Sequence, residues 1–162
     1  MNSCVDIIAA TNPAHVGLVL YQFVLGYEKA ANTGPEFSLA FLPTPLALSE
    51  RISQTFQGTN ASTGLVRWYL SDPSLQMMIS DELRACVPIT RNALIFALNS
   101  GVLVLRESGR VNTVAARLKK QPRDATGLPP QQRPLSIASR LGQWCGRLGT
   151  AEAVFSILGV RP

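Results

Sequence analysis

The spacing of apolar residues along this chain of 162 residues predicts a mostly helical protein with one β-hairpin. The first clear helix begins at Asn12-Pro13, where asparagine can cap a helix and proline suits its first turn, and it ends near residues 32–35. Its apolar positions recur at the spacing of one buried stripe, comprising Val16, Val19, Leu20, Phe23, Val24 and Tyr27.

Four short elements are predicted between this helix and Pro88. The apolar run Phe37–Leu42, closed by two prolines, indicates a buried strand or extended segment. We expect a helix from a cap at Ser49 to about Phe56, and another that contains Leu65 to Tyr69. Asp72-Pro73 predicts the start of a further helix, which we expect to end at Val87 because a residue before proline avoids the helical region.

The stretch Pro88–Val114 organises the rest of the predicted fold. Thr90 is expected to cap a helix that stops at Gly101. Val102–Arg106 and Arg110–Val114 then read as two strands joined by a tight turn. A helix followed by a two-stranded ribbon, with arginine on both sides of its turn, is the local pattern of a winged-helix domain. The predicted fold class is therefore α+β, mostly helical, with a winged-helix-like core in which the hairpin is the wing.

That pattern also occurs in proteins that do not bind DNA, because a helix and a hairpin that share an apolar face form a stable core anywhere. The apolar run at residues 93–98 favours this second interpretation, since it predicts a helix buried on all sides. A recognition helix needs several polar side chains that can reach base edges. If the domain binds nucleic acid, we expect the hairpin and the segment after it to do so.

The remainder of the chain predicts a loop and then two helices. Residues 116–133 are rich in proline, glycine, glutamine and basic residues and have no apolar period, which predicts a basic loop. A helix follows from Leu135, with a stripe that includes Trp144, and a last short helix spans residues 151–158. We therefore expect a helical and winged-helix-like domain over residues 1–115, the basic loop, and a C-terminal helical hairpin over residues 134–162 that packs on the same domain.

Charge divides the chain into two unlike parts. Up to Glu82 there are three basic and seven acidic residues, whereas from Leu83 onward there are twelve basic and three acidic ones, giving the net charge of +5. This asymmetry indicates that the C-terminal half meets an acidic partner, either nucleic acid or an acidic protein surface.

The sequence offers little support for catalysis, a cofactor or a metal. The three cysteines lack zinc-ligand spacing, and Cys86 and Cys145 fit as small core residues in a reducing cytoplasm. No phosphate-binding loop or nucleophile elbow is present, and the single histidine, His15, has no partner nearby in sequence. No run of about 20 apolar residues predicts a membrane span. We therefore expect a non-enzymatic, cytoplasmic protein.

Two sets of binding residues follow from these patterns. Non-specific DNA binding would use the basic residues of the hairpin and the loop, which are Arg106, Arg110, Arg117, Lys119, Lys120 and Arg123. Binding of a partner protein, or of a second copy in a homodimer, would use Trp144, Phe155 and Arg161. The alternative for this C-terminal element is that it simply completes the fold.

Four stretches together resemble the middle component of the bacterial three-component ABC systems. They are Asn12-Pro13 opening a helix to Gly26-Tyr27; Ala40-Phe41-Leu42-Pro43 with Leu48; Pro88-x-Thr90-Arg91-x-Ala93-Leu94-x-Phe96-Ala97-Leu98 with Gly101; and Gly142-x-Trp144 leading to Leu158-Gly159-Val160-Arg161-Pro162. The combination of the opening Asn-Pro helix with the terminal Gly-Val-Arg-Pro is the most specific part of this resemblance.

The resemblance implies a non-enzymatic adaptor between an ABC ATPase related to the chromosome-maintenance type and a third, variable component. Such systems are thought to act against mobile DNA, as in phage defence. The alternative from the residues is a winged-helix DNA-binding protein or regulator that acts on its own. The adaptor and DNA-binding interpretations are compatible, and the resemblance assigns no active residues.

Overall fold

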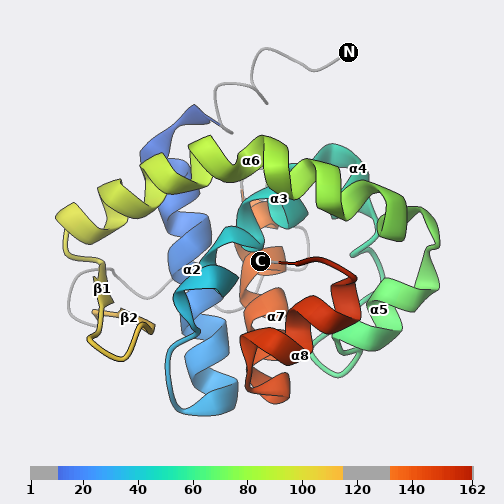
Figure 1. Ribbon diagram of the computed structural model, residues 1–162. Helices are drawn as coiled ribbons and strands as arrows, with labels where there is room; N and C mark the ends of the chain where they lie inside the picture. The colour runs from blue at the N-terminus through green and yellow to red at the C-terminus, as the bar shows by residue number, and fades with distance from the viewer. Residues whose placement is uncertain (1–10, 115–131, 162) are drawn as a thin grey trace.

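The computed structural model describes residues 11–114 and 132–161 of the chain. Two long helices, α2 and α7, lie side by side, and the longest helix, α6, crosses over them (Figure 1). The elements are α2 (Pro13–Ala31), the 3₁₀ helix η1 (Phe37–Phe41), α3 (Pro43–Leu48), α4 (Glu50–Gln54), α5 (Leu65–Ser71), α6 (Ser74–Asn99), β1 (Leu103–Leu105), β2 (Val111–Thr113), α7 (Arg133–Leu148) and α8 (Ala151–Leu158). The prediction of a mostly helical chain with one hairpin is confirmed.

Helix α2 forms as the sequence predicts. The Asn12 side chain accepts a hydrogen bond from the Ala14 amide at 3.0 Å, and proline occupies the first turn. The helix ends at Asn32, which adopts a left-handed conformation with φ of 55°. All six predicted stripe residues are buried.

The contact between α2 and α7 is unusually close because glycines remove the side chains at the crossing. A methyl group on Gly142 would lie 2.1 Å from the Phe23 carbonyl oxygen, and one on Gly26 would lie 2.2 Å from the Ser139 carbonyl oxygen. One turn further along α7, a methyl group on Gly146 would lie 2.7 Å from the Tyr27 carbonyl oxygen. The two backbones therefore touch along the crossing with no side chain between them.

Helix α6 contradicts the predicted break at Val87-Pro88. Its 26 residues run continuously through Pro88, which faces solvent. Proline removes one helical hydrogen bond. Both halves of the helix nevertheless bury one common stripe, which includes Ile79 before the proline and Leu94 after it. Tertiary packing on both sides of the proline thus outweighs its local cost of about 3 kcal/mol. Thr90 is not a helix cap but a fully buried residue inside α6.

Two further expectations about this region are corrected. Residues 93–98 are not buried on all sides, because Ile95 and Phe96 are 53% and 45% exposed. Phe37–Leu42 is not a strand, since Phe37–Phe41 form a 3₁₀ helix and the prolines after it open α3. A short apolar run fits a strand or a buried helical turn equally well by its pattern.

The hairpin is confirmed, with Leu103 opposite Thr113 and Leu105 opposite Val111. The helix before it stops at Gly101, as predicted, with φ of 72°. That helix is the last part of α6 and not a separate short helix, so the winged-helix arrangement is not confirmed.

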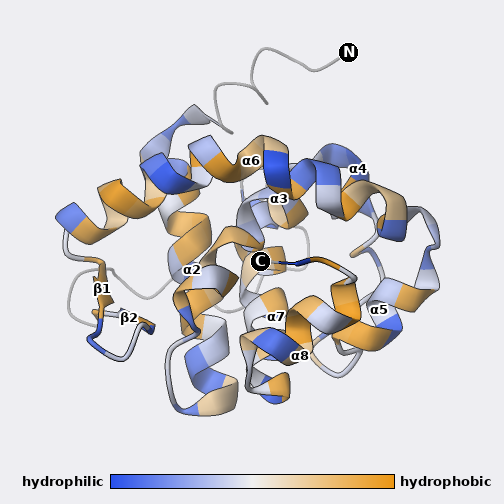
Figure 2. Cartoon of the chain, viewed as in Figure 1, coloured by the Kyte–Doolittle hydropathy of each residue, from blue (hydrophilic) through white to orange (hydrophobic). Residues whose placement is uncertain are grey.

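The C-terminal helices also form where predicted. Gly149 ends α7 in a left-handed conformation, and the Thr150 side chain caps α8 by accepting from the Ala153 amide at 3.2 Å. The stripe residues Ile137, Leu141 and Trp144 are buried. Figure 2 shows the resulting contrast between hydrophobic helix faces turned inward and hydrophilic positions on the outside.

Replacing Gly142 with alanine should test the helix contact. We expect Gly142→Ala to lower the free energy of unfolding by about 1–3 kcal/mol or more, because the new methyl group forces the two backbones apart. Gly17→Ala is the matched control, since its methyl group would lie at ordinary contact distance from its neighbours, 3.6 Å from a Phe96 ring carbon, 3.8 Å from the Ala97 methyl and 3.9 Å from the Ala93 carbonyl oxygen. That control should be neutral or stabilising by up to about 1 kcal/mol. Equal melting temperatures for the two variants would contradict this account.

Candidate protein-binding surfaces

The hairpin is fastened to the end of α2 by Glu28. Its carboxylate accepts hydrogen bonds from the Asn112 side chain at 2.9 Å, the Thr113 amide at 2.9 Å and the Thr113 hydroxyl at 2.5 Å. Backbone bonds from Phe37 to Gly109 and from Val111 to Pro35, each 2.9 Å long, join the hairpin to the segment after α2. The hairpin is thus part of the folded core and does not project freely.

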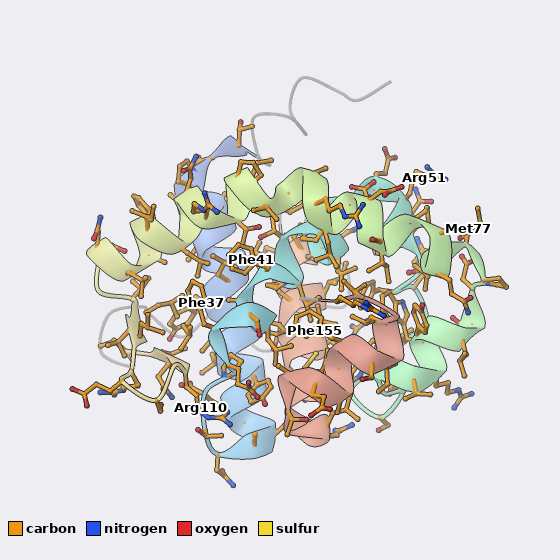
Figure 3. All side chains as sticks on the ribbon, viewed as in Figure 1. Phe37, Phe41, Arg51, Met77, Arg110 and Phe155 are labelled. Atoms are coloured by element: carbon orange, nitrogen blue, oxygen red, sulfur yellow. The ribbon has the colours of Figure 1, made fainter. Side chains whose placement is uncertain are left out.

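The two described arginines of the predicted DNA-binding set have different roles. Arg110 donates from its guanidinium to the Gly34 carbonyl at 2.7 Å, so it links the hairpin to the loop after α2 (Figure 3). Burial raises the pKa of Tyr27, and the nearby Arg110 acts against this shift. Arg106 is exposed at the turn. The other four members, Arg117, Lys119, Lys120 and Arg123, lie outside the described residues.

The predicted partner-binding residues are mostly core residues. Trp144 and Phe155 are buried, and only Arg161 is exposed. The Trp144 ring stacks on Phe56 with centroids 5.6 Å apart, and its N–H donates to the Asn60 carbonyl at 3.1 Å. Phe155 is covered because α8 packs on the body of the protein, where the Tyr69 hydroxyl donates to the Leu158 carbonyl at 3.1 Å.

One face of α7 holds the loop between α4 and α5 in place. Arg140, Trp144 and Arg147 follow one another at i, i+4 and i+7, and each donates to this loop. Arg140 reaches the Thr59 hydroxyl at 2.8 Å, and Arg147 reaches the Ala61 carbonyl. The loop and α5 are therefore positioned directly by α7.

This arrangement leaves an open groove of about 740 Å³ between α5 and the C-terminal half of α7, which we call the α5–α7 groove. Its lining is mostly apolar and includes Val66, Leu70, Leu148 and the edge of Trp144. Arg67 and Arg147 are the two basic residues of the lining, and both are exposed.

A second exposed surface follows the C-terminal part of α6. Five exposed residues recur at i, i+3, i+4, i+7 and i+8 and so share one helix face, which we call the α6 strip: Pro88, Arg91, Asn92, Ile95 and Phe96. It combines two large apolar side chains with one cation. Protein interfaces commonly join such features.

Burial shifts the pKa values of the two described thiols and of His15. Burial raises the pKa of the Cys145 thiol and of the Cys86 thiol, so both are held as neutral thiols. Burial lowers the pKa of His15. Within residues 11–114 and 132–161, no group of three or more histidine, cysteine or acidic side chains is placed to hold a metal ion. No helix in the same ranges has the length and apolar character of a membrane span.

Comparison with protein families shows which family the chain belongs to. The family described as ABC-three component (ABC-3C) system Middle Component 3 matches residues 5–162. The chain belongs to this family. Comparisons with curated proteins and with solved structures found no match. The resemblance to a middle component is thus confirmed over almost the whole length of the chain.

Sequence reasoning about this middle component missed both exposed surfaces, although a signal for each was present. Six consecutive apolar residues surround a helix, so a helix that packs on the core with one face leaves some of them exposed, and in the structure these are Ile95 and Phe96. Val66 and Leu70 are likewise separated by i, i+4 on a face of α5 opposite the buried Trp68.

Two arginine substitutions separate structural from exposed positions in the hairpin. We expect Arg110→Ala to lower the free energy of unfolding by about 1–2 kcal/mol, because it removes a charge-assisted hydrogen bond to Gly34. Arg106→Ala should leave it unchanged to within about 0.5 kcal/mol, as is usual for exposed positions. Denaturant unfolding measures both. An equal effect at the two sites would show that Arg110 does not anchor the hairpin.

Proposed function

We propose that this family member is a non-enzymatic adaptor that connects the ABC ATPase of its system to the third component. The observation that carries the proposal is the family match over residues 5–162, which assigns nearly the whole chain to the middle component. A middle component needs surfaces for other proteins, and the chain exposes apolar side chains on the α6 strip and beside the α5–α7 groove. The proposal includes an ATPase of the chromosome-maintenance type, a cytoplasmic location and a role in defence against mobile DNA, which extend the family resemblance.

We assign the α6 strip to binding of the ABC ATPase. Ile95 and Phe96 present two large apolar side chains to solvent on one rigid helix. Desolvation of such side chains contributes about 1.5–3 kcal/mol each when they become fully buried. Arg84 and Arg91 lie on the same side of α6 and are exposed, so they supply a basic rim around an apolar centre.

Co-purification with the other two components of the system tests the proposal. We expect the chain to form a stable complex with the ATPase, with the third component or with both, and Ile95→Glu to weaken the contact with the ATPase by about tenfold or more. Met77→Glu is the matched control because Met77 is 81% exposed at the opposite end of α6. Failure of the wild-type chain to associate with either component would overturn the adaptor proposal. A homodimer as the only complex formed would do the same.

Direct DNA contact is a second candidate function, compatible with the first, and it is favoured by the exposed Arg106 in a chain half that is strongly basic. If DNA binds, we expect weak, non-specific binding with dissociation constants of about 10⁻⁴ to 10⁻⁶ M that weakens steeply between about 50 and 200 mM salt. The informative variant replaces Arg106, Arg117, Lys119, Lys120 and Arg123 with alanine. It keeps Arg110, so that the hairpin stays anchored. Unaltered mobility shifts for this variant would exclude the basic set as a DNA site.

A further inference from the structure

We propose that the α5–α7 groove binds an acidic amphipathic helix of a partner protein. This inference rests on the proposed adaptor function and adds to it a second contact surface with a defined partner chemistry. Residues of α5 and α7 line the groove. Helix α5 lies at the N-terminal end of α6, whereas the α6 strip lies toward the hairpin end (Figure 1). The two surfaces can therefore be occupied at the same time.

The groove is apolar where a partner would be buried. Leu70 is 65% exposed and Val66 is 45% exposed, and they stand one turn apart on α5, so they form a short apolar ridge. Leu148 and the edge of Trp144 line the groove from α7. Large apolar side chains left this exposed beside a concave surface are typical of a protein interaction site.

The floor of the groove is rigid. Trp144 is fixed by its stack on Phe56 and by its hydrogen bond to the Asn60 carbonyl, and Phe56 in turn contacts Trp68 with ring centroids 4.5 Å apart. A site whose floor does not rearrange loses little conformational entropy when it binds. The groove is therefore preformed for its partner.

The positive charge of the groove lining indicates that the partner segment is acidic. Arg67 and Arg147 are the charged residues of the lining, and no acidic side chain belongs to it. Arg67 has no ion-pair or hydrogen-bond partner for its side chain in the described part of the chain, and Arg147 uses one donor on Ala61. A guanidinium carries five N–H donors, so Arg147 keeps others for a carboxylate. The next acidic residue along the chain, Asp72, does not line the groove. Its carboxylate accepts hydrogen bonds from the Ser74 amide at 2.9 Å and from the Ser74 hydroxyl at 2.7 Å.

The geometry favours a helix as the bound element. The groove is walled by two helices, and the two-stranded sheet lies at the hairpin, so addition of an extended strand has no edge to use here. An amphipathic helix can place its apolar stripe between α5 and α7 and its flanking acidic residues against Arg67 and Arg147. Nucleic acid fits less well because Trp144 is almost fully buried and has no free face for a base to stack on.

Leu70→Glu and Arg67→Glu test the groove in the full-length chain, with the purified ATPase and third component of the same system as the binding partners. Each variant should weaken binding of one component by about tenfold or more, because it places a negative charge against an acidic helix. Melting temperatures should stay at the wild-type value, since both side chains are exposed. Met77→Glu serves as control, because Met77 is an exposed apolar residue nearby that does not line the groove.

A photo-crosslinking residue at position 70 identifies the occupant. We expect a cross-link to a segment of one component with apolar residues at i, i+3 or i+4 and i+7, flanked by Asp or Glu. A complex that forms normally with Leu70→Glu and Arg67→Glu would overturn the groove inference while leaving the adaptor function standing. Absence of any complex with the wild-type chain would overturn the adaptor function itself. Cross-links to nucleic acid, or to a second copy of this chain, would show that the groove has a different occupant and would also overturn the inference.

Discussion

The close contact between α2 and α7 is the constraint on which the rest of this structure depends. Gly26, Gly142 and Gly146 let the two backbones meet without intervening side chains, and the remaining elements are arranged around that pair. Helix α6 packs across α2, and α3 fits against both α6 and α7. At this distance even one methyl group is too large, so the position of α7 is set by backbone geometry.

The glycine face of α7 packs against α2, which leaves another face of the helix to contact the loop between α4 and α5. The donors Arg140, Trp144 and Arg147 hold the loop before α5, and the end of this loop, at Thr63 and Gly64, lines the α5–α7 groove. At the other side of the molecule, Glu28 and Arg110 fasten the hairpin beside the end of α6. Helix α6 has 26 residues and is therefore roughly 40 Å long at about 1.5 Å per residue, and the two exposed surfaces lie toward its opposite ends. That separation suits a protein that holds two partners apart.

The helices and the hairpin could be predicted from sequence wherever local signals agreed with the tertiary structure. Asn12-Pro13, Gly101 and Thr150 act locally, and each terminates or starts its element as expected. Pro88 misled the prediction because its local preference is overridden by packing on both sides of it. The two exposed surfaces were missed for a related reason. Trp144 and Phe155 have the composition of interface anchors, but whether they are exposed depends on how α7 and α8 pack, and residue type alone does not determine this.

The pairing of α2 with α7 also fixes the order in which this chain can acquire its structure. Gly26 contacts Ser139, and the Tyr27 hydroxyl donates to Gly149 across 122 positions of sequence, so the first long helix has its main partner near the other end of the chain. During synthesis, α2 leaves the ribosome well before α7 exists. Its apolar stripe therefore lacks its main partner until α7 has been made. The contact between α2 and α7, and the packing that depends on it, can therefore form only after α7 has emerged.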